Sequence, residues 1–135
     1  RSGFHVGVLA YSGSDLVGWV SVGTLPEFYW TWRRVAQVGE GARDIAGIVC
    51  FTISSKYQNQ GLQKLMLEEL KSYGRCRGWK TIEGYPFDQS AIEKHKEHVR
   101  WPGLTKGFVD AGFEHVGPHW LSNPEAERSI YRVQL

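Results

Sequence analysis

The sequence predicts an α/β domain with a mixed sheet, and three observations support that prediction. A nearly continuous apolar run at 45–54 is typical of a buried central strand. An amphipathic helix pattern follows at 61–77 and a second strand pattern at 79–85, which is the order of a parallel crossover. Patterns typical of strand pairs flank this unit on both sides. Because the chain has 135 residues, we expect positions 1–135 to form a single domain.

The first predicted element is a hairpin. Residues 3–11 and 16–22 read as strands, and the Ser-Gly-Ser-Asp sequence at 12–15 is a turn signal between them. Residues 24–43 contain Pro26 and a cluster of aromatic side chains. We expect an irregular excursion there, with one helical turn around 30–35.

The helix at 61–77 is the clearest single element. Apolar side chains recur along it at steps of three and four residues, as one face of a helix requires. They are Leu62, Leu65, Met66, Leu70 and Tyr73. Gly78 is expected to end the helix, and Pro86 is expected to stop the strand that follows.

The C-terminal third predicts a second, shorter helix and two closing strands. Residues 88–100 are polar and indicate a loop or a solvated helix. Pro102 is suited to a first helical turn, and the stripe that follows predicts a helix as far as Ala111. The closing strands are expected at 113–121 and 129–135, joined by a turn around Asn123 and Pro124.

Composition excludes several classes of protein. With 41% hydrophobic and 13% aromatic residues the chain is not disordered, and a net charge of +2 gives no reason to expect a nucleic-acid partner. No apolar run approaches the roughly 20 residues of a membrane span, so we expect no membrane partner. The two cysteines lack metal-ligand spacing, and we expect a reduced, cytoplasmic protein without a metal.

The turn before the long helix predicts an anion site. The first amides of a helix have no partner inside it and carry partial positive charge, and Gly61 lets a ligand approach the backbone closely. A phosphate or pyrophosphate suits such a turn, and it has neutral donors and one cation nearby: Gln58, Asn59, Gln60, Gln63 and Lys64. The alternative is that Gly61 merely eases the start of the helix and the polar side chains are solvated.

Four stretches of the sequence carry a family resemblance. They are IVCFTISSKYQNQGLQKLM from 48, WKTIEGYPFD from 79, WPGLTKGFVDAGFEHVG from 101 and LVGWVSVG from 16. Together they resemble the GCN5-related N-acetyltransferase (GNAT) superfamily, and the second resembles a bacterial subgroup. The first resembles the central strand and the Q/R-x-x-G-x-G/A loop, with Gln58 and Gly61 at the first two motif positions.

The resemblance implies a GNAT-like fold and acetyl-CoA as co-substrate. The pantetheine arm is expected to pair with the strand at Cys50, Phe51, Thr52 and Ile53. The pyrophosphate is expected on the turn formed by Gln58, Asn59, Gln60, Gly61, Leu62, Gln63 and Lys64. An amine then attacks the thioester directly, so that no covalent enzyme intermediate is required.

The chain departs from the family pattern at three places. The last small residue of the loop motif is Gln63, which is expected either to crowd the pyrophosphate or to add a donor. A tyrosine that acts as general acid in many relatives corresponds to Phe108. The family's first strand and two helices have no counterpart here, so they either lie outside this chain or are replaced by 24–43 and a partner chain.

Glu83 and Tyr85 are the candidate catalytic residues. They share one face of the strand at 79–85, near the edge where open α/β sheets bind ligands. Glu83 would be the general base and Tyr85 the general acid. The alternative is that Glu83 pairs with Lys80 or a nearby arginine while Tyr85 only packs.

The aromatic cluster at 27–35 offers an acceptor pocket, in which Glu27 attracts a cationic amine and Tyr29 and Trp30 line the walls. Equally, these rings could cover core surface or form a dimer contact. Among other candidate groups, Cys50 is expected to be an inert thiol, His95 and His98 to lie on a solvated segment, and His115 and His119 to lie on a strand surface.

The leading hypothesis is therefore an acetyl-CoA-dependent N-acetyltransferase acting on a small amine. A rival is a non-catalytic acyl-CoA-binding module, which Phe108 and Gln63 favour. A third possibility is a structural homodimer.

Overall fold

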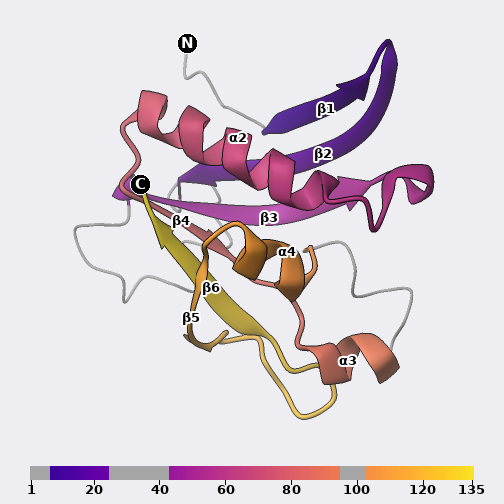
Figure 1. The fold of residues 1–135 in the computed structure, drawn as a ribbon. Helices are drawn as coiled ribbons and strands as arrows, with labels where there is room; N and C mark the ends of the chain where they lie inside the picture. The colour runs from indigo at the N-terminus through magenta and orange to yellow at the C-terminus, as the bar shows by residue number, and fades with distance from the viewer. Residues whose placement is uncertain (1–6, 25–42, 95–102) are drawn as a thin grey trace.

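The computed structural model describes residues 7–24, 43–94 and 103–135. Their strands form one six-stranded sheet in the order β1-β2-β3-β4-β6-β5 (Figure 1). Residues 25–42 of the excursion predicted at 24–43, residues 3–6 of the first predicted strand and residues 95–102 lie outside the described residues. The described part of the polar segment at 88–100 is helical from 89 to 94.

The elements follow the predicted order, with shorter bounds at several ends. The strands are β1 (Val8–Ser12), β2 (Asp15–Thr24), β3 (Ile45–Ile53), β4 (Thr81–Gly84), β5 (Glu114–Pro118) and β6 (Ser129–Gln134). The helices are η3, a 3-10 turn (Ser55–Tyr57), α2 (Leu62–Arg77), α3 (Gln89–Lys94) and α4 (Thr105–Asp110).

The predicted hairpin and crossover are both confirmed. Strands β1 and β2 are antiparallel, with Ser12 opposite Asp15 at the turn. Strands β3 and β4 are parallel and are connected through α2. As predicted, α2 ends at Gly78, whose left-handed φ of 76° lets its amide cap the last turn.

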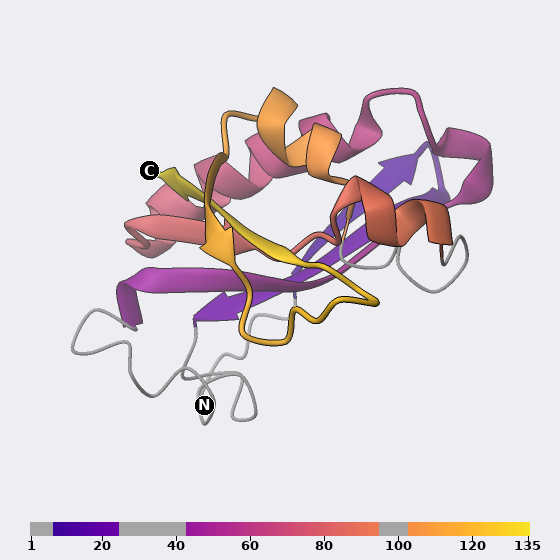
Figure 2. The same ribbon diagram turned by 90° about the horizontal axis from the view of Figure 1, so that it is seen from below.

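Helices α2 and α4 lie on the same face of the sheet, as Figure 2 shows from below. The core forms between this face and α2, whose buried Met66, Leu67 and Leu70 join the cluster that contains Ile48 and Ile82. Burying each such side chain contributes roughly 1.5–3 kcal/mol. The amphipathic pattern that predicted α2 is thus the pattern that holds it on the sheet.

Helix α4 approaches the sheet closely at Gly84 on β4. A methyl group added at Gly84 would lie 2.1 Å from Cε1 of Phe108, so that position has no room for a side chain. Phe108 is fully buried and packs edge-on against Phe113 at 5.2 Å between ring centroids. This contact seats α4 over the centre of the sheet.

The two closing strands pair as the predicted C-terminal hairpin, but the first of them is shorter than expected. Strand β6 lies between β4 and β5, so the two closing strands are antiparallel neighbours but only β6 touches the centre. Strand β5 ends at Pro118 rather than at 121. His119 beyond it is 6% exposed, so its prediction as a surface residue was wrong, whereas His115 is exposed on β5 as expected. The turn at Asn123 is confirmed, with its Oδ1 accepting the amides of residues 125 and 126.

No helix within residues 7–24, 43–94 and 103–135 has the length and apolar character needed to cross a membrane.

Candidate functional site

Strands β3 and β4 pair over only a short distance. Their parallel ladder joins 45–47 to 81–83, so the remainder of β3, from Ile48 onward, has no partner strand on that side among the described residues. Next to the end of the ladder the register with β2 shifts, with Ser21 opposite Cys50 but Val22 opposite Ile48, which leaves Val49 as a β-bulge. The segment from Cys50 to Ile53, predicted to hold pantetheine, therefore has one strand edge open beyond a bulge.

The turn between β3 and α2 presents unpaired amides. Asn59 and Gly61 both have left-handed φ values, 58° and 78°, and no side chain caps α2. From Gly61 onward, the first amide to donate along the chain is that of Leu65, to the Gly61 carbonyl. Within the described residues, none of the amides from Gly61 to Lys64 donates to another protein group. Such successive amides form a concavity that suits an anion.

A cleft of about 470 Å³ lies against this turn. One wall is formed by the end of β3, the turn that follows it and the first residues of α2. The other wall is formed by α4 and by residues 103 and 104 before it. Its described lining consists of Phe51, Ile53, Tyr57, Gln58, Asn59, Gly61, Leu62, Gln63, Lys64, Gln89, Gly103, Leu104, Lys106, Gly107 and Asp110. The predicted turn thus opens onto a cleft, whereas Cys50, Thr52 and Gln60 are not among the residues lining it.

Three glutamine side chains expected near the anion make hydrogen bonds within the fold. Gln58 Nε2 donates to the Ile53 carbonyl at 3.0 Å, and Gln60 Nε2 donates to the Lys56 carbonyl at 2.7 Å. Gln63 pairs with the backbone of Leu104. These three amides are engaged within the fold, so the donors left for a ligand at this turn include the backbone amides, Lys64 and the Asn59 side chain, which lines the cleft.

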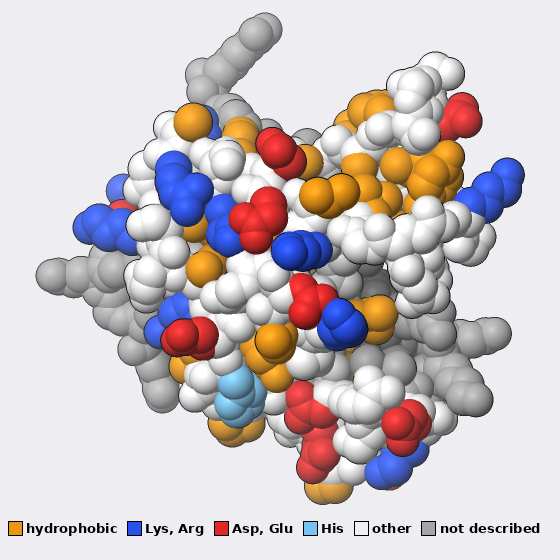
Figure 3. Space-filling view, viewed as in Figure 1, with side chains coloured by type: hydrophobic (Ala, Val, Ile, Leu, Met, Phe, Trp, Pro, Cys, Tyr) orange, Lys and Arg blue, Asp and Glu red, His pale blue; other side chains and the backbone are white. Residues whose placement is uncertain are grey.

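Charge is mixed around the cleft. Lys64 is exposed on the first turn of α2, and Lys106 on α4 forms an ion pair with Asp110. Figure 3 shows acidic and basic side chains interspersed over the face that carries α2 and α4. A ligand phosphate would therefore be selected by the local turn rather than by a broad positive surface.

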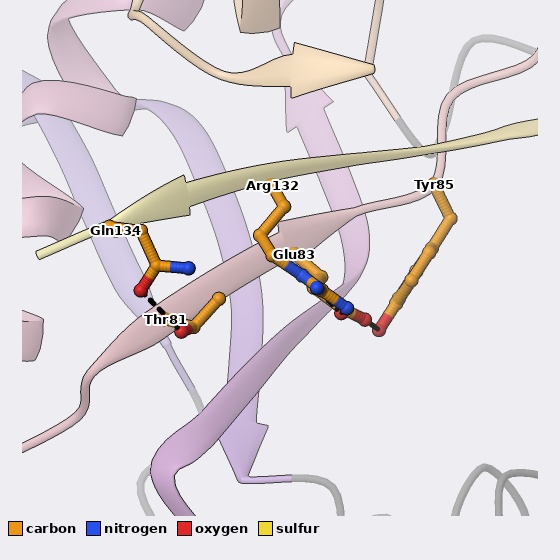
Figure 4. A network of polar contacts seen from close by, with 5 residues as sticks. All are labelled: Thr81, Glu83, Tyr85, Arg132 and Gln134. Carbon is orange, nitrogen blue, oxygen red and sulfur yellow. Dashed lines mark hydrogen bonds and ion pairs between the residues drawn. The ribbon is translucent and has the colours of Figure 1, made fainter. Parts of the chain in front are cut away.

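Glu83 and Tyr85 meet in a buried polar network on the opposite face of the sheet from α2 (Figure 4). The Tyr85 hydroxyl donates to Glu83 Oε2 at 2.9 Å, and Arg132 Nε on β6 donates to Oε1 at 2.9 Å. Arg132 Nη2 forms a further ion pair with Oε1. Neither Glu83 nor Tyr85 is among the residues that line the cleft. The structure thus brings the two predicted residues together. It also pairs Glu83 with Arg132, as the alternative interpretation of Glu83 expected of a nearby arginine.

Burial controls ionisation around Tyr85. Burial, reinforced by the negative charge of Glu83, raises the pKa of Tyr85 well above 10, so its hydroxyl stays protonated. His119 lies against it, with 4.9 Å between ring centroids. Burial, with a smaller effect from Arg128, lowers the pKa of His119 from 6.5 to about 4. Its Nδ1 accepts the amide of Leu121 at 3.1 Å, as a neutral imidazole can.

His119 predicts an acid-sensitive stability. Between pH 6.5 and about 4 the unfolded chain binds a proton at His119 that the folded chain does not, so stability falls as pH falls. The difference of about 2.5 between the two pKa values (6.5 − 4) corresponds to a loss of at most roughly 3 kcal/mol. Urea unfolding from pH 7 to 4 measures it. His119→Asn should flatten the pH dependence and exposed His115→Asn should not; equal slopes in all three proteins would contradict the assignment.

Phe108 occupies the position where the resemblance implies a general acid in relatives. Its ring is fully buried between Gly84 and Phe113 and does not line the cleft. A ring hydroxyl at this position would be directed into the packed core near β4, because the para carbon lies 2.4 Å from where a methyl group on Gly84 would stand.

Phe108→Tyr is therefore expected to lower stability without adding activity. An unsatisfied buried hydroxyl costs about 1–3 kcal/mol, which corresponds to a melting temperature lower by several degrees. Thermal unfolding and thiol release from acetyl-CoA are the two measurements, with Phe108→Leu as the control that removes ring packing without adding a polar group. A tenfold gain in turnover in Phe108→Tyr would show that the ring does reach the reacting thiol.

The sequence missed the second wall of the cleft. Gly103, Leu104, Lys106 and Gly107 line it, whereas the sequence predicted no ligand-binding role for these four residues. The glycines at 103 and 107 were the available signal, since a glycine inside or next to a short helix indicates close approach of another group. Glu27, Tyr29 and Trp30, the predicted acceptor residues, lie outside the described residues. Among those described, no group of three His, Cys, Asp or Glu side chains is placed to hold a metal ion.

Comparison with known proteins gave matches at the level of structure. No family model matches the sequence, and neither does a curated protein. Ribosomal-protein-alanine N-acetyltransferase from Brucella melitensis is similar with a TM-score of 0.65 at 16% identity, over 94% of this chain and 67% of that one. A GNAT-family acetyltransferase from Streptococcus pneumoniae gives 0.62 at 16% identity, over 94% and 64%.

A third similar structure holds the predicted co-substrate. The yncA protein of Salmonella typhimurium, solved with its cofactor acetyl-CoA, gives a TM-score of 0.64 at 16% identity, over 94% of this chain and 62% of that one. The chain thus spans between 62% and 67% of the length of these three structures. The chain has the fold of the GNAT-family acetyltransferases.

Proposed function

We propose that the protein binds acetyl-CoA in the cleft beside Gly61 and transfers the acetyl group to the amine of a small molecule. The unpaired amides of the turn from Gly61 to Lys64, facing a cleft of about 470 Å³, carry the proposal. A pyrophosphate would accept from these amides at the positive end of α2. The acetyl-CoA complex of the yncA protein, which has a similar fold, supports the same choice of ligand.

The open edge of β3 supports the placement of the thioester. Backbone groups beyond the Val49 bulge, around Cys50 to Ile53, are available on the side from which β4 diverges. An extended pantetheine arm can pair with such an edge as an added strand does. An amide of the same edge could then stabilise the oxyanion of the tetrahedral intermediate.

Glu83 is the proposed general base. Arg132 holds its carboxylate in one orientation, and the Tyr85 hydroxyl donates to the other oxygen. An ionised carboxylate of this kind can take a proton from the attacking amine, directly or through one water. The thiolate leaving group needs little help, because thiols ionise near pH 8.5, so the raised pKa of Tyr85 does not block the reaction.

Calorimetry with coenzyme A tests the binding step. We expect saturable binding and a rise in melting temperature, since a ligand at 100 times its Kd stabilises the folded state by about 2.7 kcal/mol. Thiol release across a panel of small primary amines then tests transfer. Absence of both heat and thermal stabilisation at millimolar coenzyme A would contradict the proposal.

A non-catalytic acyl-CoA-binding module is the second candidate. Burial of Phe108 and engagement of Glu83 by Arg132 both favour it. It predicts coenzyme A binding without thiol release for any amine in the panel. A homodimer that completes the acceptor side stays a prediction, which sedimentation of the ligand-free protein tests.

A further inference from the structure

Gln63 joins the two walls of the cleft through one side chain. Its Nε2 donates to the carbonyl of Leu104 at 2.9 Å, and its Oε1 accepts the amide of the same residue at 3.0 Å. Both polar atoms of the side chain are thus paired with the backbone of one residue, 41 positions away. Leu104 immediately precedes α4, so the pair holds the start of that helix against the first turn of α2.

Two glycines make room for this side chain. A methyl group added at Gly107 would lie 2.4 Å from Cδ of Gln63, and one at Gly103 would lie 3.1 Å from its Nε2. Real methyl groups do not approach to the first of these distances, so a larger residue at 107 would displace Gln63. Gly103 also has a left-handed φ of 89°, which favours glycine.

A second tie holds the far end of α4. Lys71, two turns further along α2, donates to the carbonyl of Ala111 at 2.8 Å and pairs with Glu68. Helix α4 has only six residues, too few to be stable without such contacts. Gln63 and Lys71 therefore fix opposite ends of α4, but only the Gln63 tie lies in the cleft lining.

We propose that Gln63 is a positioning residue that sets the separation of the two cleft walls and thereby the affinity for acyl-CoA. The inference rests on the proposed function. The Gln63 side chain neither fills the anion site nor donates a hydrogen bond to it, because its side-chain amide group is turned toward Leu104. Breaking the pair frees the start of α4, and with it Lys106 and Gly107, which line the cleft.

Gln63→Met tests the proposal, because methionine keeps the unbranched shape and removes both hydrogen bonds. In the ligand-free protein, we expect the Leu104 amide to exchange its hydrogen at least about tenfold faster, since its acceptor is lost. We expect the Kd for coenzyme A to rise roughly tenfold, in line with the loss of about one net hydrogen bond.

Lys71→Met is the matched control. It breaks the tie at the other end of α4 and should lower the melting temperature by a similar amount, while the Kd for coenzyme A stays within about twofold of the parent value. Equal changes in Kd for Gln63→Met and Lys71→Met would mean that Gln63 only stabilises α4 in general, and this result would overturn the proposal. Unchanged exchange at Leu104 in Gln63→Met would overturn it as well.

Gly107→Ala provides an approach that leaves Gln63 itself intact. Its methyl group should displace the Gln63 side chain and raise the Kd for coenzyme A by a similar factor. Adding Gln63→Ala should remove the clash, so the melting temperature should match that of Gln63→Ala alone, but the affinity should not recover. Recovery of parent affinity in the double variant would contradict a positioning role. If the parent protein itself fails to bind coenzyme A, the proposed function fails; if it binds and Gln63→Met binds equally, only this inference fails.

Discussion

Gly61→Asp is expected to reduce affinity for coenzyme A by a factor of about 100 or more. The substitution places a carboxylate where the unpaired amides of α2 would receive the pyrophosphate, and like charges at close range in a partly desolvated cleft repel strongly. Aspartate tolerates the left-handed φ of 78° better than most residues, so the backbone need not change. Calorimetry at low and at physiological ionic strength measures the loss.

Gly61→Asn separates charge from shape. Asparagine has nearly the same size and the same tolerance of this φ, so we expect a loss of about tenfold or less, from crowding alone. The Asp variant should bind coenzyme A more weakly than the Asn variant but melt at a higher temperature, because a carboxylate at a helix N-terminus stabilises the helix by about 0.3–1 kcal/mol. Equal affinities for the Asp and Asn variants would mean that no anion binds at this turn.

Glu83→Gln is expected to lower turnover by a factor on the order of 10² while leaving the Kd for acetyl-CoA unchanged. Glutamine keeps an oxygen for Arg132 and turns its amide toward the Tyr85 hydroxyl oxygen, so the network of Figure 4 can persist without the charge. Glu83 does not line the cleft, which is why binding should be spared. Steady-state thiol release with an amine from the panel measures the turnover, and calorimetry measures the Kd for acetyl-CoA.

Glu114→Gln is the matched control for that variant. Glu114 on β5 lies directly opposite Arg132 and is exposed, so the change removes a neighbouring carboxylate without touching the buried pair. We expect turnover within about twofold of the parent value, since surface ion pairs contribute little. Unchanged turnover in Glu83→Gln would show that Glu83 is not the general base and that its carboxylate has only a structural role, as the partner of Arg132.

The candidate site was predictable where its determinants are local. The sequence predicts the turn at Gly61 because a polar loop, one glycine and an amphipathic helix pattern follow each other within a few residues. The alternation along β4 correctly placed Glu83 and Tyr85 on one face. The destinations of the Gln58, Gln60 and Gln63 side chains were not predictable, because an exposed amide can reach a ligand or a carbonyl with equal ease.

The order of the elements, the parallel crossover and the caps of α2 were determined by the sequence itself, since propensity, periodicity and glycine conformation act over a few residues. Only the tertiary structure decided that β6 lies beside β4, which delivers Arg132 to Glu83 from 49 residues away. It also decided that α4 forms the second wall of the cleft, held by Gln63 from 41 residues away. Such contacts depend on how buried surfaces pack across the whole sheet, and no local pattern encodes that choice.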